Sequence, residues 1–290
     1  MVRCNPICRF ARVEGPLRFK GAIDTIVMSM SKPSPRATAK DLARRLLPQS
    51  WRPEIRRWYN RLTWPLYIGR AVECNCCAGG FRRFRAWSDE QGILWPMCPR
   101  CGSLGRMRVD WLFLTSRTDL LESPKRLLHV APEVCIGRHL ERLPNISYLS
   151  ADYASALAME QMDITDIRYP DESFDVVLCN HVLVYIDDDK LAIREIFRVL
   201  SSGGWALLQV PLDSSRETTF EDASVTDPRE RHRIFGQYDH VRIYGRDYLQ
   251  RLEEAGFEVS VDEFVKELPA ATIEQLGLDT SEIIYLCRKR

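Results

Sequence analysis

Ten cysteines stand in this 290-residue chain, and four of them are spaced as two pairs that could bind a metal ion. Cys74 and Cys77 form one Cys-x-x-Cys pair, and Cys98 and Cys101 form a second pair after twenty intervening residues. This spacing is typical of two knuckles that close on one tetrahedral zinc ion. Four protein ligands leave no open position for a substrate, so we predict a structural zinc ion.

The remaining cysteines have other predicted roles. Cys76 lies inside the first pair, where its thiolate could compete for a ligand position. Cys179 and Cys287 fall in apolar segments and are predicted to be buried packing residues. Paired spacing that occurs twice is not expected of cysteines that only fill a core. Metal binding is therefore favoured over disulfides.

Composition excludes some classes of protein. No window approaches 18 consecutive apolar residues, so a membrane-spanning helix is not expected. The first thirty residues place five basic side chains among short apolar pieces, a pattern unlike that of a secretory signal. We expect a cytoplasmic protein.

Charge is distributed unevenly although the net charge is only +1. Residues 1–85 hold 18 Lys and Arg against five Asp and Glu, and the rest of the chain is acidic. This basic arm is either a solvated tail or a contact for a polyanion, such as RNA or an anionic membrane surface.

Composition and pattern divide the chain into four parts. Residues 1–40 are predicted to be a basic, disordered arm, 41–70 an amphipathic helical segment, 71–115 the zinc ribbon, and 116–290 the main domain. Aromatic side chains among the arginines of 41–70 would pack against the body or lie at a membrane interface.

The main domain alternates between segments typical of strands and of helices. Strands are predicted at 126–132, 146–152, 162–167, 174–181, 203–211, 257–264 and 282–289, and helices at 134–142, 188–200 and 246–255, with a short helix before 162. Such alternation predicts an α/β fold with a mostly parallel sheet that is covered on both faces.

From residue 126 onwards the chain resembles the class I methyltransferases that depend on S-adenosylmethionine. The resemblance is strongest over 162–211, where "PDESFDVV", a strand ending in Asn180 and His181, a helix, and "VLSSGGWALL" follow in the family's order. With the ribbon in front and 235–259 behind, the whole chain resembles a bacterial subgroup of that family. The resemblance implies a Rossmann-like, seven-stranded sheet and S-adenosylmethionine as the cofactor.

The resemblance also implies a donor site at the carboxyl ends of the strands. Asp152, which ends the second strand, would bind the ribose hydroxyls or cap the segment that follows it. Asp163 and Ile164 would lie at the adenine edge, and Asn180 would face the donor after the fourth strand.

Residues 127–133, "LLHVAPE", depart from the family, which has an acid and then a glycine-rich turn at this point. His129 takes the place of the acid, and Ala131, Pro132 and Glu133 take the place of the turn. Pro132 lacks an amide donor and fixes φ, so the turn must have another geometry. Glu133 would bind the ammonium group of the donor or sit at the start of the next helix. His129 is predicted to be a buried histidine that supports the turn, and direct contact with the donor is its alternative role.

Methylation of a hydroxyl or a protonated amine requires a base. His181 follows the fourth strand, where the residues that face the substrate lie in the family. Asp239, His240 and Tyr244 share one polar segment that is predicted to cover the pocket. We therefore expect the catalytic and substrate-binding groups among these four residues.

We predict an S-adenosylmethionine-dependent methyltransferase that methylates an oxygen or nitrogen atom of a small-molecule or saccharide-like metabolite. Arg242 and Arg246 would hold an anionic substrate or pair with the acidic body. The alternatives are an RNA methyltransferase that uses the ribbon and the basic arm, and a non-catalytic binding protein with a degenerate donor site. Residues 180–183, "NHVL", lack an N-P-P-Y-type base-methylating motif, which disfavours RNA.

Overall fold

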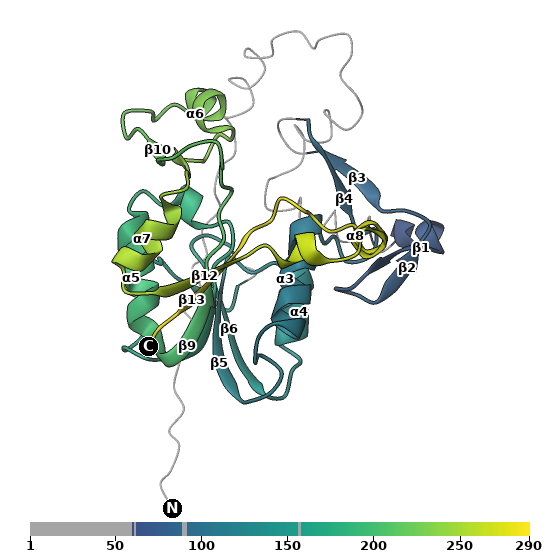
Figure 1. Cartoon of the computed structure of the whole chain (residues 1–290), viewed down its shortest axis with the longest axis horizontal. Coiled ribbons are helices and arrows are strands. Elements are labelled where there is room, and N and C mark those ends of the chain that lie inside the picture. The colour runs from purple at the N-terminus through teal and green to yellow at the C-terminus, as the bar shows by residue number, and fades with distance from the viewer. Residues whose placement is uncertain (1–59, 61, 89–91, 156–157) are drawn as a thin grey trace, which may run out of the picture. The chain divides into compact units, whose positions relative to one another are not determined.

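The computed structural model describes residues 60, 62–88, 92–155 and 158–290 (Figure 1). The predicted basic arm and most of the predicted helical segment lie outside these residues. All described residues belong to one compact unit, Arg57–Arg290. Within that unit, residues 64–67 form a 3₁₀ helix and 68–70 already belong to a strand, so the amphipathic helix predicted for 41–70 does not extend to residue 70.

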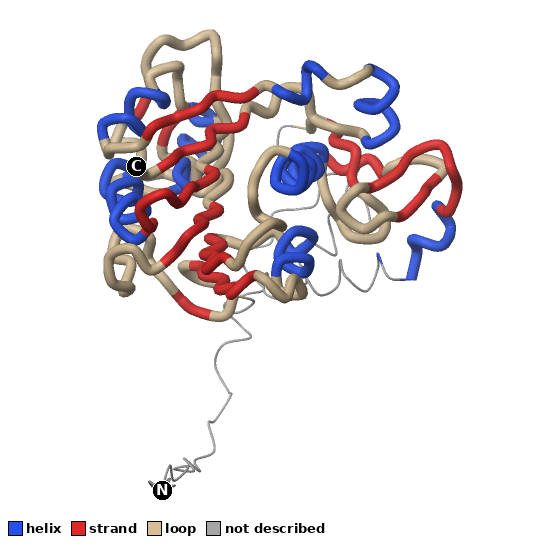
Figure 2. The backbone as a smooth tube through the Cα atoms, turned by 60° about the horizontal axis from the view of Figure 1, so that its bottom comes forward, coloured by secondary structure: helices blue, strands red, loops and turns tan. Residues whose placement is uncertain are grey.

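Seven strands form one large sheet. They are β5 (Lys125–Val130), β6 (Ile146–Asp152), β7 (Glu160–Gln161), β8 (Phe174–Leu178), β9 (Leu200–Leu207), β12 (Glu258–Asp262) and β13 (Ile284–Arg288). Their order is β12-β13-β9-β8-β5-β6-β7. Only β13 runs antiparallel to its neighbours, β9 and β12. The seven-stranded, mostly parallel sheet is therefore confirmed, and Figure 2 shows its strands in succession between the helices.

The direction of winding changes between β5 and β8. From β5 the chain proceeds outwards through β6 and β7, and it then returns to pair β8 with the other side of β5. Ligands of open α/β sheets bind beyond the carboxyl ends of the strands at such a switch point. The loops after β5 and β8 are thus the place to search for a donor site.

Helices cover both faces of the sheet. They are α3 (Gly105–Ser116), α4 (Val134–Leu140), α5 (Asp189–Val199) and α7 (Tyr248–Glu254). Side chains alternate along each strand, so Leu128 and Val130 pack with α5 and α7, whereas Leu127 packs with α3 and α4. Cys179 and Cys287 are fully buried in the first of these cores, which confirms their prediction as packing residues.

The cysteine-rich part of the chain consists of two small antiparallel hairpins. One pairs β1 (Ile68–Cys74) with β2 (Gly79–Phe81), and the other pairs β3 (Arg85–Ser88) with β4 (Leu94–Met97). Trp87 and Trp95 lie opposite each other in the second hairpin. Phe81 is buried in the same core as α3 and α4, so the ribbon packs on that side of the sheet.

The buried guanidinium of Arg108 joins the ribbon to the end of the chain. It donates to the carbonyl of Pro96 in β4 at 2.8 Å and to the carbonyls of Leu276 and Gly277 at 2.7 and 2.6 Å. These last two residues end α8 (Ala270–Leu276). The sequence pattern carries no signal for this contact, because Arg108 and Gly277 are 169 positions apart.

Several predicted elements are corrected by the structure. The strand predicted at 162–167 is wrong, because β7 ends at Gln161 and the carboxylate of Asp163 accepts hydrogen bonds from the amide and hydroxyl of Thr165, which makes a turn. Elements that were not predicted include α3, α8, α6 (Pro228–Phe235), β10 (Phe220–Glu221), β11 (Arg242–Ile243) and the 3₁₀ helices Trp64–Tyr67, Leu183–Tyr185 and Phe264–Glu267. In the part of the chain that the structure describes, no helix has the length and apolarity needed to cross a membrane.

Candidate active site and metal cluster

The four paired cysteines converge on one point. The Sγ atoms of Cys74 and Cys101 lie 3.6 Å apart, those of Cys77 and Cys98 lie 3.7 Å apart, and all four lie within 4.8 Å of one another. Four sulfur atoms at about 2.3 Å from one tetrahedral ion lie about 3.8 Å from each other. The cluster therefore has the size and the donor set that zinc requires.

Cys76 is not part of this group. Its side chain is 1% exposed, and its Sγ lies 3.6 Å from the backbone carbonyl of Met107 in α3. It packs between the ribbon and the main sheet. The predicted competition of Cys76 for a ligand position is thus not seen in the geometry.

The turn after β5 has a backbone shape that suits glycine. Ala131 has φ of +46°, in the left-handed region that side chains with a Cβ disfavour. Its amide donates to the carbonyl of Ala151 at the end of β6, at 2.7 Å. Ala131 thus reproduces the tight turn that a glycine would make, while Pro132 contributes no amide donor to it.

The side chains that flank this turn are bound to each other. Nε2 of His129 lies 2.7 Å from Oε2 of Glu133, and Nδ1 of His129 lies 3.1 Å from the hydroxyl of Tyr148. His129 is 1% exposed and is buried as predicted. Glu133 is the N-cap residue of α4, but its side chain makes no capping hydrogen bond. Burial alone would raise the pKa of Glu133, and the contact with His129 outweighs it and lowers the pKa.

The two acids predicted for the ribose and adenine edge both stabilise turns. Oδ1 of Asp152 accepts from the amides of Ala154 and Ser155 at 2.8 and 2.7 Å, as the capping interpretation expects. Asp163 holds its own turn, and Ile164 is 4% exposed. Asp152 ends β6 and Asp163 follows β7, so both stand at the carboxyl edge of the sheet where a donor would bind. Their roles toward a donor stay predictions.

Asn180 and His181, in the loop after β8, differ in their side-chain contacts. Asn180 is 7% exposed, and within the described part of the chain neither its side-chain nitrogen nor its side-chain oxygen has a hydrogen-bond partner. His181 has φ of +55°, a strained conformation for a residue with a side chain, and strain of this kind is concentrated at functional sites. Nε2 of His181 lies 3.0 Å from Oε1 of Glu282, which is also buried.

Glu282 belongs to a buried polar chain that sequence reasoning missed. The side-chain amide of Gln209 donates to Glu282 at 3.0 Å and to Asp110 at 2.8 Å. Gln209 and Asp110 are fully buried. The only signal for them is that each interrupts an apolar pattern, Gln209 after β9 and Asp110 within α3.

A pocket of about 570 Å³ opens beside His181. Its walls come from the second ribbon hairpin with the start of α3, the loops after β8 and β9, β11 with the segment before it, and the segment before β13. Lining residues include Trp87, Trp95, Arg106, His181, Val210, His240, Arg242 and Glu282. A pocket with apolar and aromatic walls and a few polar groups is typical of a small-molecule site.

His240 joins His181 in this pocket, as predicted, but its neighbours Asp239 and Tyr244 do not line it. Burial lowers the pKa of His240, and the nearby His181 adds to this effect. Asp239 is half-buried beside His240, and one of its carboxylate oxygens has no partner. Tyr244 is fully buried behind the pocket wall, where its hydroxyl donates to Asp189 at 2.7 Å.

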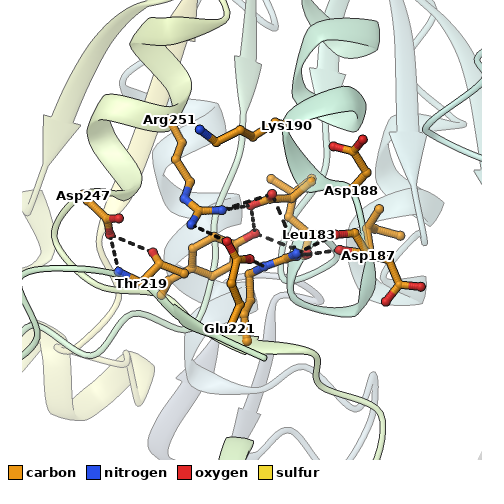
Figure 3. A network of polar contacts seen from close by, with 12 residues as sticks. Leu183, Asp187, Asp188, Lys190, Thr219, Glu221, Asp247 and Arg251 are labelled. Atoms are coloured by element: carbon orange, nitrogen blue, oxygen red, sulfur yellow. Dashed lines mark hydrogen bonds and ion pairs between the residues drawn. The ribbon is translucent and has the colours of Figure 1, made fainter. Parts of the chain in front are cut away.

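Arg242 belongs to an internal network of ion pairs. Figure 3 shows this network around Glu221 and Arg251. The guanidinium of Arg242 bonds Glu221 at 2.9 Å and lies 3.7 Å from Asp189, and Arg251 bonds the same two carboxylates. Arg246 lies on the surface, 3.3 Å from Glu217. Both predicted anion-binding arginines are therefore paired with acidic side chains of the chain itself, the second of the two roles considered for them.

Residues at the switch point fit the donor that the resemblance implies. The turn at Ala131 allows a close approach of the backbone, Asp152 supplies a carboxylate at the end of β6, and Asn180 has an amide with donor and acceptor atoms unused. Buried polar atoms without partners are rare in folded proteins and call for an explanation such as a ligand.

Comparisons with known proteins agree with this reading of the sheet. Residues 140–208 match the family model described as a methyltransferase domain. Similar solved structures include the [4+2]-cyclase SpnF, with 18% identity, a TM-score of 0.43 and coverage of 83% of this chain and 97% of that chain. Another is an S-adenosylmethionine-dependent methyltransferase from Mesorhizobium loti, with 17% identity, a TM-score of 0.39 and coverage of 62% and 97%. No curated protein matches the chain significantly.

The strand order and the family match support the same conclusion. The matched residues run from the end of α4 to just past β9 and so include the switch point and the loop that carries Asn180 and His181. Residues 140–208 of the chain thus match a methyltransferase domain, and they lie in a sheet with the strand order of a Rossmann-like fold.

Proposed function

We propose that this chain transfers the methyl group of S-adenosylmethionine to an oxygen or nitrogen atom of a small molecule held in the pocket beside His181. The observation that carries the proposal is the contact between His181 and Glu282, 3.0 Å long, inside a pocket of about 570 Å³. The pocket lies next to the carboxyl ends of β8 and β9, beside the switch point where the donor is expected.

The donor supplies a methyl group on a positively charged sulfur, which an acceptor displaces in line. In this proposal Asp152 accepts hydrogen bonds from the ribose hydroxyls, and Asp163 and Ile164 border the adenine. Ala131, Pro132 and Asn180 face the methionine part of the donor. His129 and Glu133 support the turn through their mutual contact and do not touch the donor.

His181 has the geometry of a general base. Its Nε2 is held by Glu282, which leaves Nδ1 as the basic nitrogen that would take a proton from an acceptor hydroxyl or ammonium group. Glu282 is fixed in turn by the side-chain amide of Gln209. His240 is a second imidazole in the pocket. Burial lowers its pKa, and it would hydrogen-bond the acceptor.

The walls of the pocket favour a small, partly apolar acceptor. Trp87 and Trp95, which pair across the second hairpin, present flat apolar surfaces, and His240 and Glu282 add polar contacts. Such a mixture suits a ring with polar substituents, including a saccharide-like metabolite. Most of the basic arm, on which the RNA alternative depends, lies outside the described residues.

We further propose that Cys74, Cys77, Cys98 and Cys101 bind one Zn²⁺ ion with a structural role. The ion would fix the two hairpins to each other and so position Trp87 and Trp95 at the pocket. Thiolates that must remain reduced to bind zinc fit the reducing conditions of the cytoplasm.

A labelled donor tests the proposed function. Protein is incubated with CD₃-labelled S-adenosylmethionine and a small-molecule extract of bacterial cells, and mass spectrometry identifies compounds that gain the CD₃ group. A labelled product is expected, together with calorimetric binding of S-adenosylhomocysteine. Binding of neither donor nor demethylated donor would refute the proposal.

Two histidine variants test the role of the base. His181→Asn is expected to lower the rate of product formation by about 10²-fold or more while its affinity for S-adenosylhomocysteine stays within about twofold. His232→Asn, an exposed histidine of α6, is the matched control and keeps full activity. Full activity of His181→Asn would contradict the assignment of the base.

A further inference from the structure

Four buried or half-buried polar side chains near the switch point have atoms without a partner. These atoms are Oδ2 of Asp110, Oε1 of Gln209, both amide atoms of Asn180, and Nε of Arg106. Asp110 and Gln209 are fully buried, and Asn180 is 7% exposed. Such a group destabilises the folded protein when it is left without a hydrogen bond. A fold that keeps four such polar side chains close together is expected to bind a ligand there.

Hydrogen bonds and helix spacing bring the residues that carry these side chains close together. The amide of Gln209 donates to Asp110 at 2.8 Å, and the backbone amide of His181, next to Asn180, donates to the carbonyl of Gln209 at 2.7 Å. Arg106 stands four residues before Asp110 on α3, so the two side chains lie on the same face of the helix.

Arg106 is the cationic member of the cluster. It lines the pocket beside His181, and among the described residues no carboxylate forms an ion pair with it. Arg242, which lines the same pocket, is by contrast bonded to Glu221 and to three backbone carbonyls. Arg106 is therefore the guanidinium of this pocket that can bind an anionic group of a ligand.

The turn after β5 is poorly equipped to bind both charges of an amino acid. Pro132 has no amide to offer, and the carboxylate of Glu133 is held at 2.7 Å by His129. The methionine part of the donor carries a carboxylate and an ammonium group close together. Each group needs a partner of opposite charge or several hydrogen bonds when it leaves water.

We propose that α3 supplies the binding site for the amino-acid end of the donor, with Arg106 on its carboxylate and Asp110 on its ammonium group. This inference rests on the proposed function. Asn180 and Gln209 would complete the site, since their free carbonyl oxygens can accept from the ammonium group and the free nitrogen of Asn180 can donate to the carboxylate. The cluster would thus take over the part of the donor that the glycine-free turn does not hold.

The test compares two ligands that differ only at this end. S-adenosylhomocysteine carries the amino-acid group, and 5′-methylthioadenosine has the same nucleoside and sulfur without it. Arg106→Gln and Asp110→Asn are each expected to lower the affinity for S-adenosylhomocysteine by about tenfold or more, since each variant loses a charge-assisted contact. Their affinity for 5′-methylthioadenosine stays within about twofold of the wild type, because nothing in the proposal links them to the nucleoside.

Arg138→Gln, an exposed arginine of α4, is the matched control and changes neither affinity. Because Arg106 has no ion-pair partner in the described part of the protein, its variant is expected to fold even if Asp110→Asn does not. If the wild type binds S-adenosylhomocysteine and Arg106→Gln weakens both ligands equally or neither, the inference is overturned while the proposed function stands. If the wild type binds neither ligand, the proposed function fails and the inference fails with it.

Discussion

Nε2 of His129 lies 2.7 Å from Oε2 of Glu133, with side chains 1% and 10% exposed, across the turn where β5 meets α4. The contact joins a residue near the end of strand β5 to the N-cap residue of helix α4. It fixes a turn whose backbone, at Ala131, has a shape that glycine would adopt more easily. The pair therefore stabilises through a side-chain contact a turn that glycine would allow through its greater backbone freedom.

The first prediction concerns the coupling between these two side chains. Glu133→Gln and His129→Gln are each expected to lower the free energy of unfolding by about 1–3 kcal/mol, because each leaves a buried polar partner behind. The double variant should lose less than the sum of the two, with a coupling of about 1 kcal/mol or more in urea denaturation. Additive losses would show that the contact contributes no stability.

The same pair predicts a pH dependence. The pKa of Glu133 is lowered in the folded protein, so its contribution is present above the pKa of the unfolded chain and is lost as pH falls through the folded value. The stability advantage of the wild type over Glu133→Gln should thus shrink as the pH falls below the ordinary carboxyl range. An advantage that grew on acidification would contradict the assignment.

The second prediction concerns backbone strain at the turn. Ala131 has φ of +46°, and the left-handed region costs a residue with a Cβ about 1 kcal/mol relative to glycine. Ala131→Gly is therefore expected to raise the free energy of unfolding by about 0.5–1 kcal/mol. Ala192→Gly, within α5, is the control and should lower it by about 1 kcal/mol. Equal losses for both variants would argue against strain at Ala131.

The sequence carried enough information for the sheet and for the cysteine cluster. Apolar runs such as Leu127–Val130 mark buried strands whatever follows them, and Cys-x-x-Cys spacing is local. The polar chain from Asp110 through Gln209 to Glu282 could not be predicted, because its members meet over separations of 99 and 73 residues. Their contact depends on the order of the strands and not on any local pattern.

The segment around His240 shows the same limit. Asp239, His240 and Tyr244 are close in sequence, but only His240 lines the pocket, since Tyr244 faces Asp189 in the core. Sequence proximity does not determine which side of a loop a side chain occupies. The catalytic or substrate-binding roles predicted for Asp239 and Tyr244 therefore find no support in the lining of this pocket.

The third prediction concerns the metal. Metal analysis of the purified protein should find about one zinc ion per chain, and Cys98→Ser should lose it together with a large part of the thermal stability. Cys76→Ser is the matched control, because Cys76 lies outside the cluster and packs on the carbonyl of Met107. It should keep the zinc. Loss of zinc from Cys76→Ser alone would place this residue among the ligands.

The fourth prediction concerns the network of Figure 3. Asp189 is 4% exposed and lies between the guanidinium groups of Arg242 and Arg251, which are 3% and 9% exposed. Asp189→Asn leaves both cations short of a buried partner and should lower the free energy of unfolding by about 3–5 kcal/mol. Asp187→Asn changes an exposed carboxylate two positions earlier and should cost less than about 0.5 kcal/mol. Similar losses for the two variants, measured in urea, would contradict a structural role for the network.

The fifth prediction follows from the charge state of Asp110. Burial raises the pKa of Asp110 well above its ordinary value, and the carboxylates of Glu282 and Glu133 raise it further against the opposing effects of Gln209 and Arg106. Without a ligand its carboxyl group therefore holds a proton to a higher pH than an exposed Asp. An ammonium group bound there favours the charged form, so binding of S-adenosylhomocysteine should release up to about one proton at any pH at which the unliganded carboxyl group is still protonated.

Calorimetry in buffers of different ionisation enthalpy measures that release. It should be present for S-adenosylhomocysteine, absent for 5′-methylthioadenosine, and abolished by Asp110→Asn, because only the first ligand brings an ammonium group to this carboxylate. The pKa of Glu133 is already lowered by His129, so Glu133 is ionised before the ligand binds and cannot be the source of the proton. A proton release that persists in Asp110→Asn would show that another group titrates. It would contradict the proposed contact between the ammonium group and Asp110 of α3.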